Sequence, residues 1–234
     1  MDRTEDRTTA AAGETPGHDT AEPAPADMLA LVQAEQARVA AAFRPDERLL
    51  FGAWGTAWLV GFLLMWAGSP LREGGPLVAV PGVVVGVAFF LLLLSAGVVT
   101  AVHSTRAGRG LRGASSRVGA MYGWGWFLGF ASLPLVVLSA DRLGAPPEVA
   151  ALLWPALSGL VVGLLYIGGG AAWDDPTQFA IGAWILVTTG LGCLLGLPGL
   201  YLVMALAGGG GFLAAAAWFA LRRRRYAAVP AERV

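Results

Sequence analysis

The sequence lacks lysine and asparagine altogether, and Cys193 is the only cysteine among its 234 residues. A single thiol excludes an intrachain disulfide, a CxxC redox pair and a zinc site built on several thiolates. All 16 basic residues are therefore arginine, and alanine, glycine and valine are abundant. This bias is typical of GC-rich genomes, so we predict a GC-rich bacterial source.

Charged side chains are scarce as well, at 14% of the residues, whereas hydrophobic residues make up 56%. Soluble domains carry roughly 25% charged and 45–50% apolar residues. This balance, with a mean hydropathy of +0.63, excludes an ordinary soluble domain and predicts a protein surrounded by lipid. The 16 acidic and 16 basic residues cancel, and a net charge of zero argues against a nucleic-acid partner.

The charges divide unevenly along the chain. Residues 1–48 hold ten acidic residues and five arginines, whereas residues 49–234 hold six acidic residues and eleven arginines. We predict that residues 1–26 form a disordered acidic arm, because they contain almost no large apolar side chain. The arm has no basic start followed by an apolar stretch, as a signal peptide would have, so the N-terminus should stay in the cytoplasm.

Residues 27–46 are predicted to form a short juxtamembrane amphipathic helix that Asp27 caps and Pro45 ends. One interpretation is a helix that lies on the membrane surface or docks on a partner. The other is a helix that packs against its own bundle.

Six apolar runs come after this helix, each long enough to cross the hydrocarbon core, which takes about 20 helical residues. Pro198 and Gly199 form a turn signal that divides the last apolar stretch into two spans. The predicted fold class is all-α, a polytopic transmembrane helical bundle over residues 47–225 with a cytoplasmic tail at 226–234. The predicted spans are 49–68, 77–102, 119–140, 151–173, 179–197 and 199–221.

The arginines predict the orientation, because short cytoplasmic loops collect positive charge. With the N-terminus inside, twelve of the arginines that follow the acidic arm lie on the cytoplasmic side and only Arg72 and Arg142 lie outside. We therefore predict a protein of the bacterial inner membrane with both termini cytoplasmic. A loop between the second and third spans and the end of the sixth span should contact anionic lipid head groups, at about 1 kcal/mol for each arginine. These arginines are Arg106, Arg109, Arg112, Arg117, Arg222, Arg223, Arg224 and Arg225.

Pairs of glycines four residues apart predict where the spans pack, because small residues let helix backbones approach closely in a bilayer. Internal packing is one interpretation, and a homodimer seam on one of these faces is the alternative. The candidate packing residues are Gly82, Gly86, Gly125, Gly129, Gly159, Gly163, Gly192 and Gly196.

Aspartate, glutamate, arginine and histidine are absent from the interior of every predicted span. Such residues mark ion paths and proton relays in many transporters, so a proton-coupled antiporter is not expected. His18 and His103 are too few and too distant for a metal site, and no serine has a histidine base on a later span. We predict no catalytic residues, no metal and no cofactor, and hence no enzyme.

A candidate cavity is indicated by hydroxyl groups and glycines inside the spans. Four consecutive glycines near the middle of the sixth span favour a bend or an unwound segment, because each costs roughly 1 kcal/mol against alanine in a helix. Broken helices line binding sites in many transporters, although close packing explains the same glycines. The candidate cavity residues are Ser158, Tyr166, Thr188, Thr189, Gly208, Gly209, Gly210 and Gly211.

The stretch from Met28 to Phe62 carries a resemblance to a known family. This stretch resembles a family of uncharacterised six-helix membrane proteins of GC-rich bacteria in its segments Pro45–Gly52, Trp54-Gly55 and Trp58–Phe62. Members of that family are often labelled putative transporter. The chain is also similar, more loosely, to permease subunits of the ABC-2 type. That likeness implies that the Arg106–Arg117 loop meets an ATPase subunit.

These observations favour a small permease, or a permease subunit, for a neutral or apolar substrate. The alternative is a non-transporting membrane scaffold or regulatory partner that acts through its cytoplasmic N-terminal segment. The expected partners are an anionic bilayer and either a second copy of the chain or a partner membrane or ATPase subunit.

Overall fold

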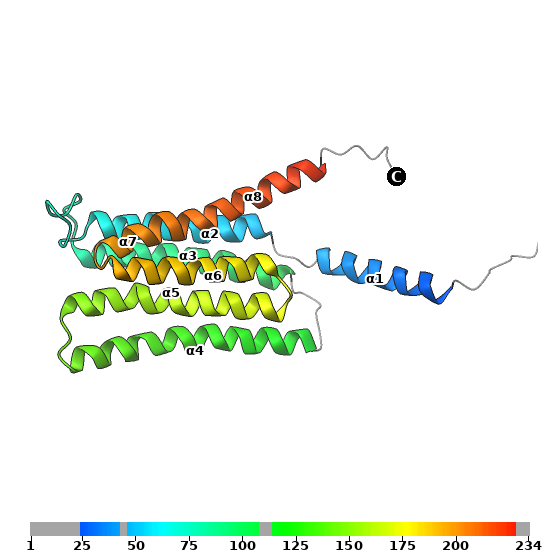
Figure 1. The fold of residues 1–234 in the computed structure, drawn as a ribbon, viewed down its shortest axis with the longest axis horizontal. Helices are drawn as coiled ribbons and strands as arrows, with labels where there is room; N and C mark the ends of the chain where they lie inside the picture. The colour runs from blue at the N-terminus through cyan, green and yellow to red at the C-terminus, as the bar shows by residue number, and fades with distance from the viewer. Residues whose placement is uncertain (1–23, 43–45, 108–113, 228–234) are drawn as a thin grey trace, which may run out of the picture. The chain divides into compact units, whose positions relative to one another are not determined.

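The computed structural model describes residues 24–42, 46–107 and 114–227. The described residues form helices joined by turns, with no strand among them, as predicted. The chain divides into two compact units, residues 1–42 and 43–234. Figure 1 shows the helices, which are α1 (Pro25–Ala42), α2 (Glu47–Ala67), α3 (Gly82–Ala107), α4 (Ala114–Arg142), α5 (Pro147–Ala172), α6 (Pro176–Leu194), α7 (Gly199–Val203), the π-helical turn η1 (Met204–Gly209) and α8 (Gly210–Ala227).

Six helical segments of the second unit are long and apolar enough to cross a membrane. They are α2 to α6 and the continuous run of α7, η1 and α8. The predicted number of spans is confirmed, and the chain is a multi-pass membrane protein. The predicted tail at 226–234 begins inside α8, and residues 228–234 lie outside the described part of the chain.

The second span begins later than predicted, at Gly82 and not at residue 77. Pro81 stands directly before it, and the residue before a proline is pushed away from helical geometry. The N–H group of Leu77 instead donates a hydrogen bond to the carbonyl of Ala67 at 2.7 Å, which closes a turn after α2.

The predicted basic loop is shorter than the sequence indicates. Arg106 lies in the last turn of α3, and α4 already begins at Ala114, so Arg117 is helical too. Arg109 and Arg112 belong to residues 108–113, which lie outside the described part.

The first unit contributes one described helix, α1. It begins at Pro25, which suits a first turn because proline lacks the N–H group that would be unpaired there. Asp27 therefore lies inside the first turn and is not the predicted cap, and the helix ends at Ala42, shortly before Pro45, the residue predicted to end it. The apolar side chains of Met28, Leu29, Leu31 and Val32 are all exposed. The amphipathic function of this helix stays a prediction, and residues 1–23 of the predicted arm lie outside the described residues.

The spans of the second unit pack in an order that differs from their order in the chain. α2 packs against α3 on one side and against η1 and α8 on the other, while α6 packs against α7, η1 and α5, and α5 packs against α4. α3 and α4 are consecutive in sequence, yet α3 packs mainly on α2 and α4 mainly on α5. Figure 1 shows α4 at one edge of the bundle. Most apolar side chains of α3 and α4 therefore face outward, where a membrane places lipid.

The core lies where α2, α6, α7, η1 and α8 meet. Aromatic rings hold α2 to α8, since the Trp58 ring packs edge-on against Phe212 with 5.3 Å between centroids and against Phe62 at 5.7 Å. Edge-to-face pairs contribute about 0.5–1.5 kcal/mol beyond the area that they bury. The buried core residues are Trp58, Phe62, Val162, Ile185, Leu200, Tyr201, Met204, Ala205 and Phe212.

Two glycine contacts let backbones approach inside this core. A Cβ atom built on Gly182 of α6 would stand 2.7 Å from the carbonyl oxygen of Gly163 on α5, and one on Gly209 of η1 would stand 2.5 Å from the backbone nitrogen of Leu59 on α2. Of the predicted packing glycines, Gly125, Gly129, Gly159, Gly163 and Gly192 have a neighbouring helix within contact distance of such a Cβ.

The other three predicted packing glycines do not pack against any other described part of the chain. Nothing lies within 4 Å of a Cβ built on Gly82 or Gly86, because that side of α3 faces away from α2. Gly196 falls after the end of α6, in a turn where it adopts a left-handed φ of +64°. The four-residue spacing alone did not distinguish a packed face from an open one.

Candidate functional site

The run from Gly199 to Ala227 changes helix type in its middle, at η1. A π-helical turn bonds i to i+5, so it inserts an extra residue into the helix and redirects the turns beyond it. α7 and η1 both pack against α6, whereas α8 packs against α2 and has few contacts with α6. α8 thus diverges from α6 beyond η1. The predicted alternatives were a bend or an unwound segment, and the helix stays continuous through the four glycines, with the π-helical turn at Met204–Gly209.

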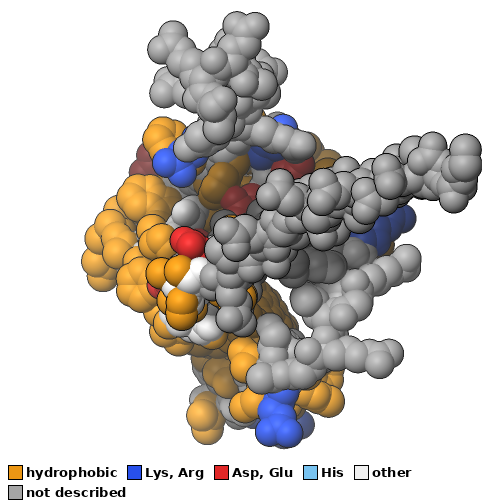
Figure 2. Space-filling model, turned by 90° about the vertical axis from the view of Figure 1, so that its right-hand side faces the viewer, with side chains coloured by type: hydrophobic (Ala, Val, Ile, Leu, Met, Phe, Trp, Pro, Cys, Tyr) orange, Lys and Arg blue, Asp and Glu red, His pale blue; other side chains and the backbone are white. Residues whose placement is uncertain are grey.

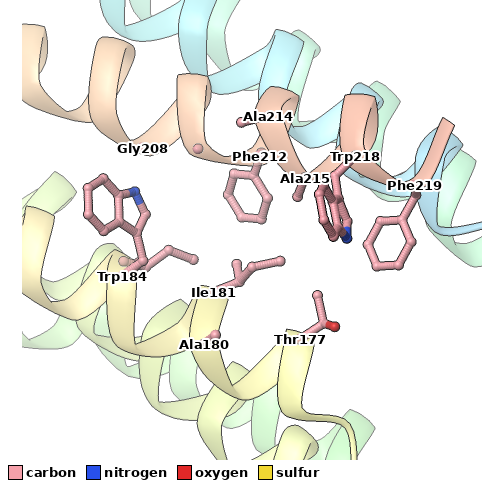
Figure 3. Close-up of a pocket in the computed structure, with 12 residues that line it drawn as sticks. Thr177, Ala180, Ile181, Trp184, Gly208, Phe212, Ala214, Ala215, Trp218 and Phe219 are labelled. Atoms are coloured by element: carbon pink, nitrogen blue, oxygen red, sulfur yellow. The ribbon is translucent and has the colours of Figure 1, made fainter. Parts of the chain in front are cut away.

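The divergence leaves a groove of about 440 Å³ between α6 and the η1–α8 run, which we term the lateral groove. Figure 3 shows its two walls, with Ile181 and Trp184 on α6 facing Phe212 and Trp218 on α8. Its volume falls in the range of known ligand sites, roughly 300–1,000 Å³. The groove is lined by Thr177, Ala180, Ile181, Trp184, Ile185, Gly208, Gly211, Phe212, Ala214, Ala215, Trp218 and Phe219.

Trp184 fixes the deep end of the lateral groove. Its indole Nε1 donates a hydrogen bond of 2.9 Å to the carbonyl of Ala207 in η1, which joins α6 to the π-helical turn. Half of this side chain is exposed, at 50%, so the ring also forms part of the groove wall. Gly211 is needed beside it, because a Cβ there would stand 2.7 Å from the same Nε1.

The length of the lateral groove corresponds to one leaflet of a bilayer. Its α6 wall runs from Thr177 to Ile185, or about 12 Å at 1.5 Å per residue, and its η1–α8 wall from Gly208 to Phe219, or about 16 Å. The hydrocarbon core is about 30 Å thick, so one leaflet is about half of that. Thr177 lies in the first turn of α6, so the groove opens near the end of the bundle where α6 begins and α8 ends.

The predicted cavity residues divide into two groups. Gly208 and Gly211 line the lateral groove. Thr188 and Thr189 are buried, at 4% and 2% exposure. The Thr188 hydroxyl donates to the carbonyls of Trp184 and Ile185, and the Thr189 hydroxyl donates to the sulfur of Met204 at 3.6 Å. The prediction of a cavity lined by the two threonines is therefore wrong, because their hydroxyls are bonded inside the core.

The four remaining candidates also lie elsewhere. The Tyr166 ring packs edge-on between Trp126 of α4 and Phe212 of α8. Ser158 is half-buried on α5 and is no part of the groove wall. Gly209 packs on the α2 backbone, and a Cβ at Gly210 would meet open space.

The aromatic residues of the groove wall were not among the predicted site residues. Their spacing carries a signal, since Gly211, Ala215 and Trp218 recur every three to four residues and so share one face of α8. Thr177, Ile181 and Trp184 have the same spacing on α6. What the spacing cannot give is the angle between the two helices.

Arginines gather at the end of the bundle where α2, α4 and α6 begin and where α3, α5 and α8 end, which we call the basic end. Figure 2 shows blue arginine side chains around hydrophobic ones there. The described candidates for lipid contact, Arg106, Arg117 and Arg222, are exposed. The Arg222 guanidinium lies 5.2 Å from the centre of the Trp218 ring. Arg223 to Arg225 follow Arg222 in α8 at the same end. At the opposite end of the bundle, the Arg72 guanidinium lies 5.4 Å from the centre of the Trp66 ring.

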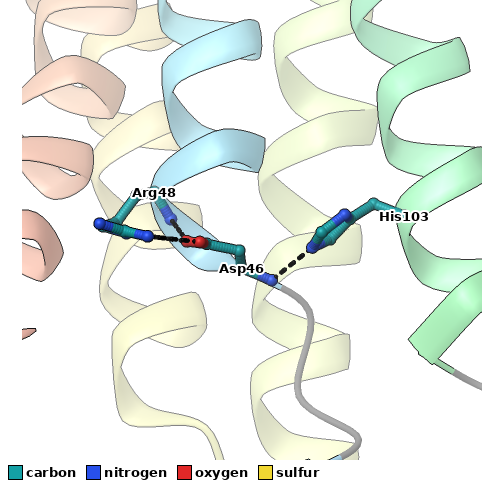
Figure 4. Close-up of polar contacts among 3 residues, drawn as sticks. All are labelled: Asp46, Arg48 and His103. Atoms are coloured by element: carbon teal, nitrogen blue, oxygen red, sulfur yellow. Dashed lines mark hydrogen bonds and ion pairs between the residues drawn. The ribbon is translucent and has the colours of Figure 1, made fainter.

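A second groove of about 520 Å³ lies between α2 and α3, with Arg48 at the basic end. Arg48 is paired with the carboxylate of Asp46 through two side-chain hydrogen bonds of 2.6 and 3.0 Å. The backbone N–H of Asp46 donates to Nε2 of His103 on α3 at 2.8 Å (Figure 4). The three residues thus hold the start of α2 against the end of α3.

The His103 contact gives a testable prediction. His103→Ala removes the acceptor of the Asp46 N–H and should weaken the α2–α3 junction by about 1 kcal/mol, whereas His103→Gln retains a polar acceptor. Hydrogen exchange of the peptide over residues 46–50 should accelerate severalfold in the alanine variant. Equal exchange in both variants and the parent chain would show that this hydrogen bond does not hold the start of α2.

Within the described residues, no group of three or more histidine, cysteine, aspartate or glutamate side chains could hold a metal ion. The chain matches no protein-family model, no curated protein and no solved structure. The resemblance to uncharacterised six-helix bacterial proteins therefore stays a prediction. What the chain does has to be argued from the lateral groove and the charges around it.

Proposed function

We propose that the chain is a small permease, or the permease subunit of a larger system, for a molecule whose apolar part enters the lateral groove sideways from the bilayer. The observation that carries the proposal is the lateral groove, a one-leaflet slot with an apolar and aromatic lining. Lipid chains are as apolar as this lining. Selection must therefore come from the shape of the slot and from its aromatic rings, as in other ligand sites.

The π-helical turn supports movement rather than storage. η1 lies at the deep end of the groove, and π-helical turns recur at functional sites. Glycine has wider backbone freedom than other residues, and a Cβ at Gly210 would meet open space, so the backbone angle between η1 and α8 can change there while Gly209 stays packed on α2. A small rotation of α8 about η1 would widen or close the groove. This movement does not require a charged side chain inside a span. As the sequence predicts, we take this activity to be non-enzymatic.

The orientation is part of the proposal. The described arginines of the bundle divide between its ends, with Arg48, Arg106, Arg117 and Arg222 at the basic end and Arg72 and Arg142 at the other. Positive charge favours the cytoplasmic side, so we place the basic end and both termini in the cytoplasm of a bacterium. The lateral groove then faces the inner leaflet of the cytoplasmic membrane.

Filling the groove tests the proposal. Ala214 and Ala217 are both exposed on α8, but only Ala214 lines the lateral groove. Ala214→Phe should slow transport about tenfold, because the added ring occupies space in the groove that the transported molecule needs. Forcing extra atoms into a packed site costs about 1–3 kcal/mol. The measurement uses the full chain in phosphatidylcholine vesicles and a single-chain amphiphile with a fluorescent head group, whose transfer between leaflets is monitored by dithionite bleaching.

Ala217→Phe is the matched control and should transfer the probe at the parent rate. Ala180→Phe places the same ring on the opposite wall and should act like Ala214→Phe. Far-UV circular dichroism establishes that each variant is folded. Transfer by the parent chain no faster than in protein-free vesicles, or equal rates for Ala214→Phe and Ala217→Phe, would refute the proposal.

The scaffold alternative has a narrower basis. α1 belongs to a unit of its own, and its described apolar side chains are exposed, as a partner-binding helix would have them. The ABC-2-type alternative depends on the Arg106–Arg117 loop, of which residues 108–113 lie outside the described residues. We therefore rank the permease first.

A further inference from the structure

The lateral groove has a chemical asymmetry along its length. Its deep end is closed by the Trp184 indole and η1, whereas its open end is flanked by Trp218 and Phe219 in the last turns of α8. Arg222 comes one turn later, and its guanidinium lies over the Trp218 ring at 5.2 Å. Cation–π contacts form within about 6 Å of the ring centroid. The same ring thus lines the apolar slot and holds a positive charge at its mouth.

We infer that the groove takes up an anionic phospholipid of the leaflet at the basic end, with one acyl chain along the apolar walls and the phosphate against Arg222. This inference rests on the proposed function for the groove and names its substrate class. The slot is about 12–16 Å long, which suits the chain of a lipid from one leaflet. A wholly apolar molecule would leave the charge at the mouth unused.

The acidic residue next to the α6 wall is engaged with the helix that it precedes. Asp174 and Asp175 precede the α6 wall, and the Asp175 carboxylate accepts hydrogen bonds from the backbone N–H groups of Thr177 and Gln178. It therefore caps the positive end of the α6 dipole. Asp174 lies one residue further from the wall. On α8 the positive charge continues into Arg223, Arg224 and Arg225.

The structure also supplies a matched control for Arg222. Arg72 makes the same kind of contact with Trp66 at the opposite end of the bundle, at 5.4 Å, and lines neither the lateral groove nor the groove between α2 and α3. Substituting each arginine by glutamine removes one charge and one cation–π contact. Only Arg222→Gln changes the mouth of the lateral groove.

The test uses the full chain in phosphatidylcholine nanodiscs with three lipids that carry the same diazirine-labelled acyl chain. These are phosphatidylglycerol, phosphatidylcholine and diacylglycerol. Photolabelling is quantified on the peptides over residues 177–185 and 208–219. Phosphatidylglycerol should label these peptides about fivefold more than diacylglycerol, as expected for one arginine near the membrane surface. Arg222→Gln should remove this preference, and Arg72→Gln should keep it.

The outcomes separate the inference from the proposed function. Equal labelling by the three lipids, or a preference that survives Arg222→Gln, would overturn the inference that Arg222 selects an anionic head group. The proposal that an apolar chain occupies the groove would still stand. A preference lost equally in Arg72→Gln would also overturn it, because the effect would then be one of general charge. Absence of label from both peptides with every lipid would overturn the inference and the lateral entry of substrate together.

Discussion

Replacing Gly209 by alanine is expected to destabilise the bundle by about 3 kcal/mol, a large effect for one methyl group. The new Cβ would stand 2.5 Å from the backbone nitrogen of Leu59 and 3.0 Å from the carbonyl oxygen of Gly55. Both atoms belong to the α2 backbone, so no side-chain rotation relieves the clash. η1 and α2 must separate, which loosens the junction where most of the core residues meet.

Gly210→Ala provides the control for this prediction. Nothing lies within 4 Å of a Cβ at that position, and alanine is favoured over glycine in a helix by about 1 kcal/mol. The neighbouring substitution should thus leave stability unchanged or raise it slightly. The measurement is the SDS mole fraction at half-unfolding, determined by circular dichroism at constant lipid content. Similar midpoints for the two variants would show that η1 does not pack closely on α2.

Trp58→Ala is expected to cost about 3–5 kcal/mol, the usual range for deleting a buried large aromatic side chain. Trp58 is 5% exposed, and its ring bridges Phe62 on its own helix and Phe212 on α8. It also covers Gly208, whose Cβ would stand 3.0 Å from the ring. The deletion leaves a cavity in a close-packed interface, and lipid cannot fill it.

The matched variant is Trp124→Ala on α4. Trp124 is 61% exposed and stacks edge-on with Phe127 of the same helix at 5.5 Å. Lipid can replace the contacts that this ring loses, so the shift should stay below about 1 kcal/mol. The same SDS titration compares the two. If Trp124→Ala were as destabilising as Trp58→Ala, the outward position of α4 in the bundle would be wrong.

Much of the fold could be predicted from the sequence, because it depends on local patterns. Runs of about 20 apolar residues reveal spans whatever their neighbours, and the Pro198-Gly199 pair correctly divided the last two. The ends of the spans were less accurate. Pro81 delays α3, and polar residues extend α4 beyond the apolar run.

The candidate site could be predicted only in part. Gly208 and Gly211 were found because a glycine run is visible in the sequence. Thr188 and Thr189 were misplaced, because a hydroxyl in a span fits a cavity and a buried hydrogen bond equally well. Trp184 and Trp218 could not be predicted as site residues, because the sequence does not show which helices lie opposite them.

The sequence by itself determined that this is a six-span helical membrane protein with its arginines gathered at one end. Composition, run length and charge position are properties that no tertiary contact alters. The tertiary structure alone decided that α2 pairs with α8, that α3 and α4 are separated, and that η1 turns α8 away from α6. The lateral groove results from that pairing. The angle between two helices depends on which backbones can approach, as Gly55 and Gly209 do, and single-helix patterns do not specify the partner.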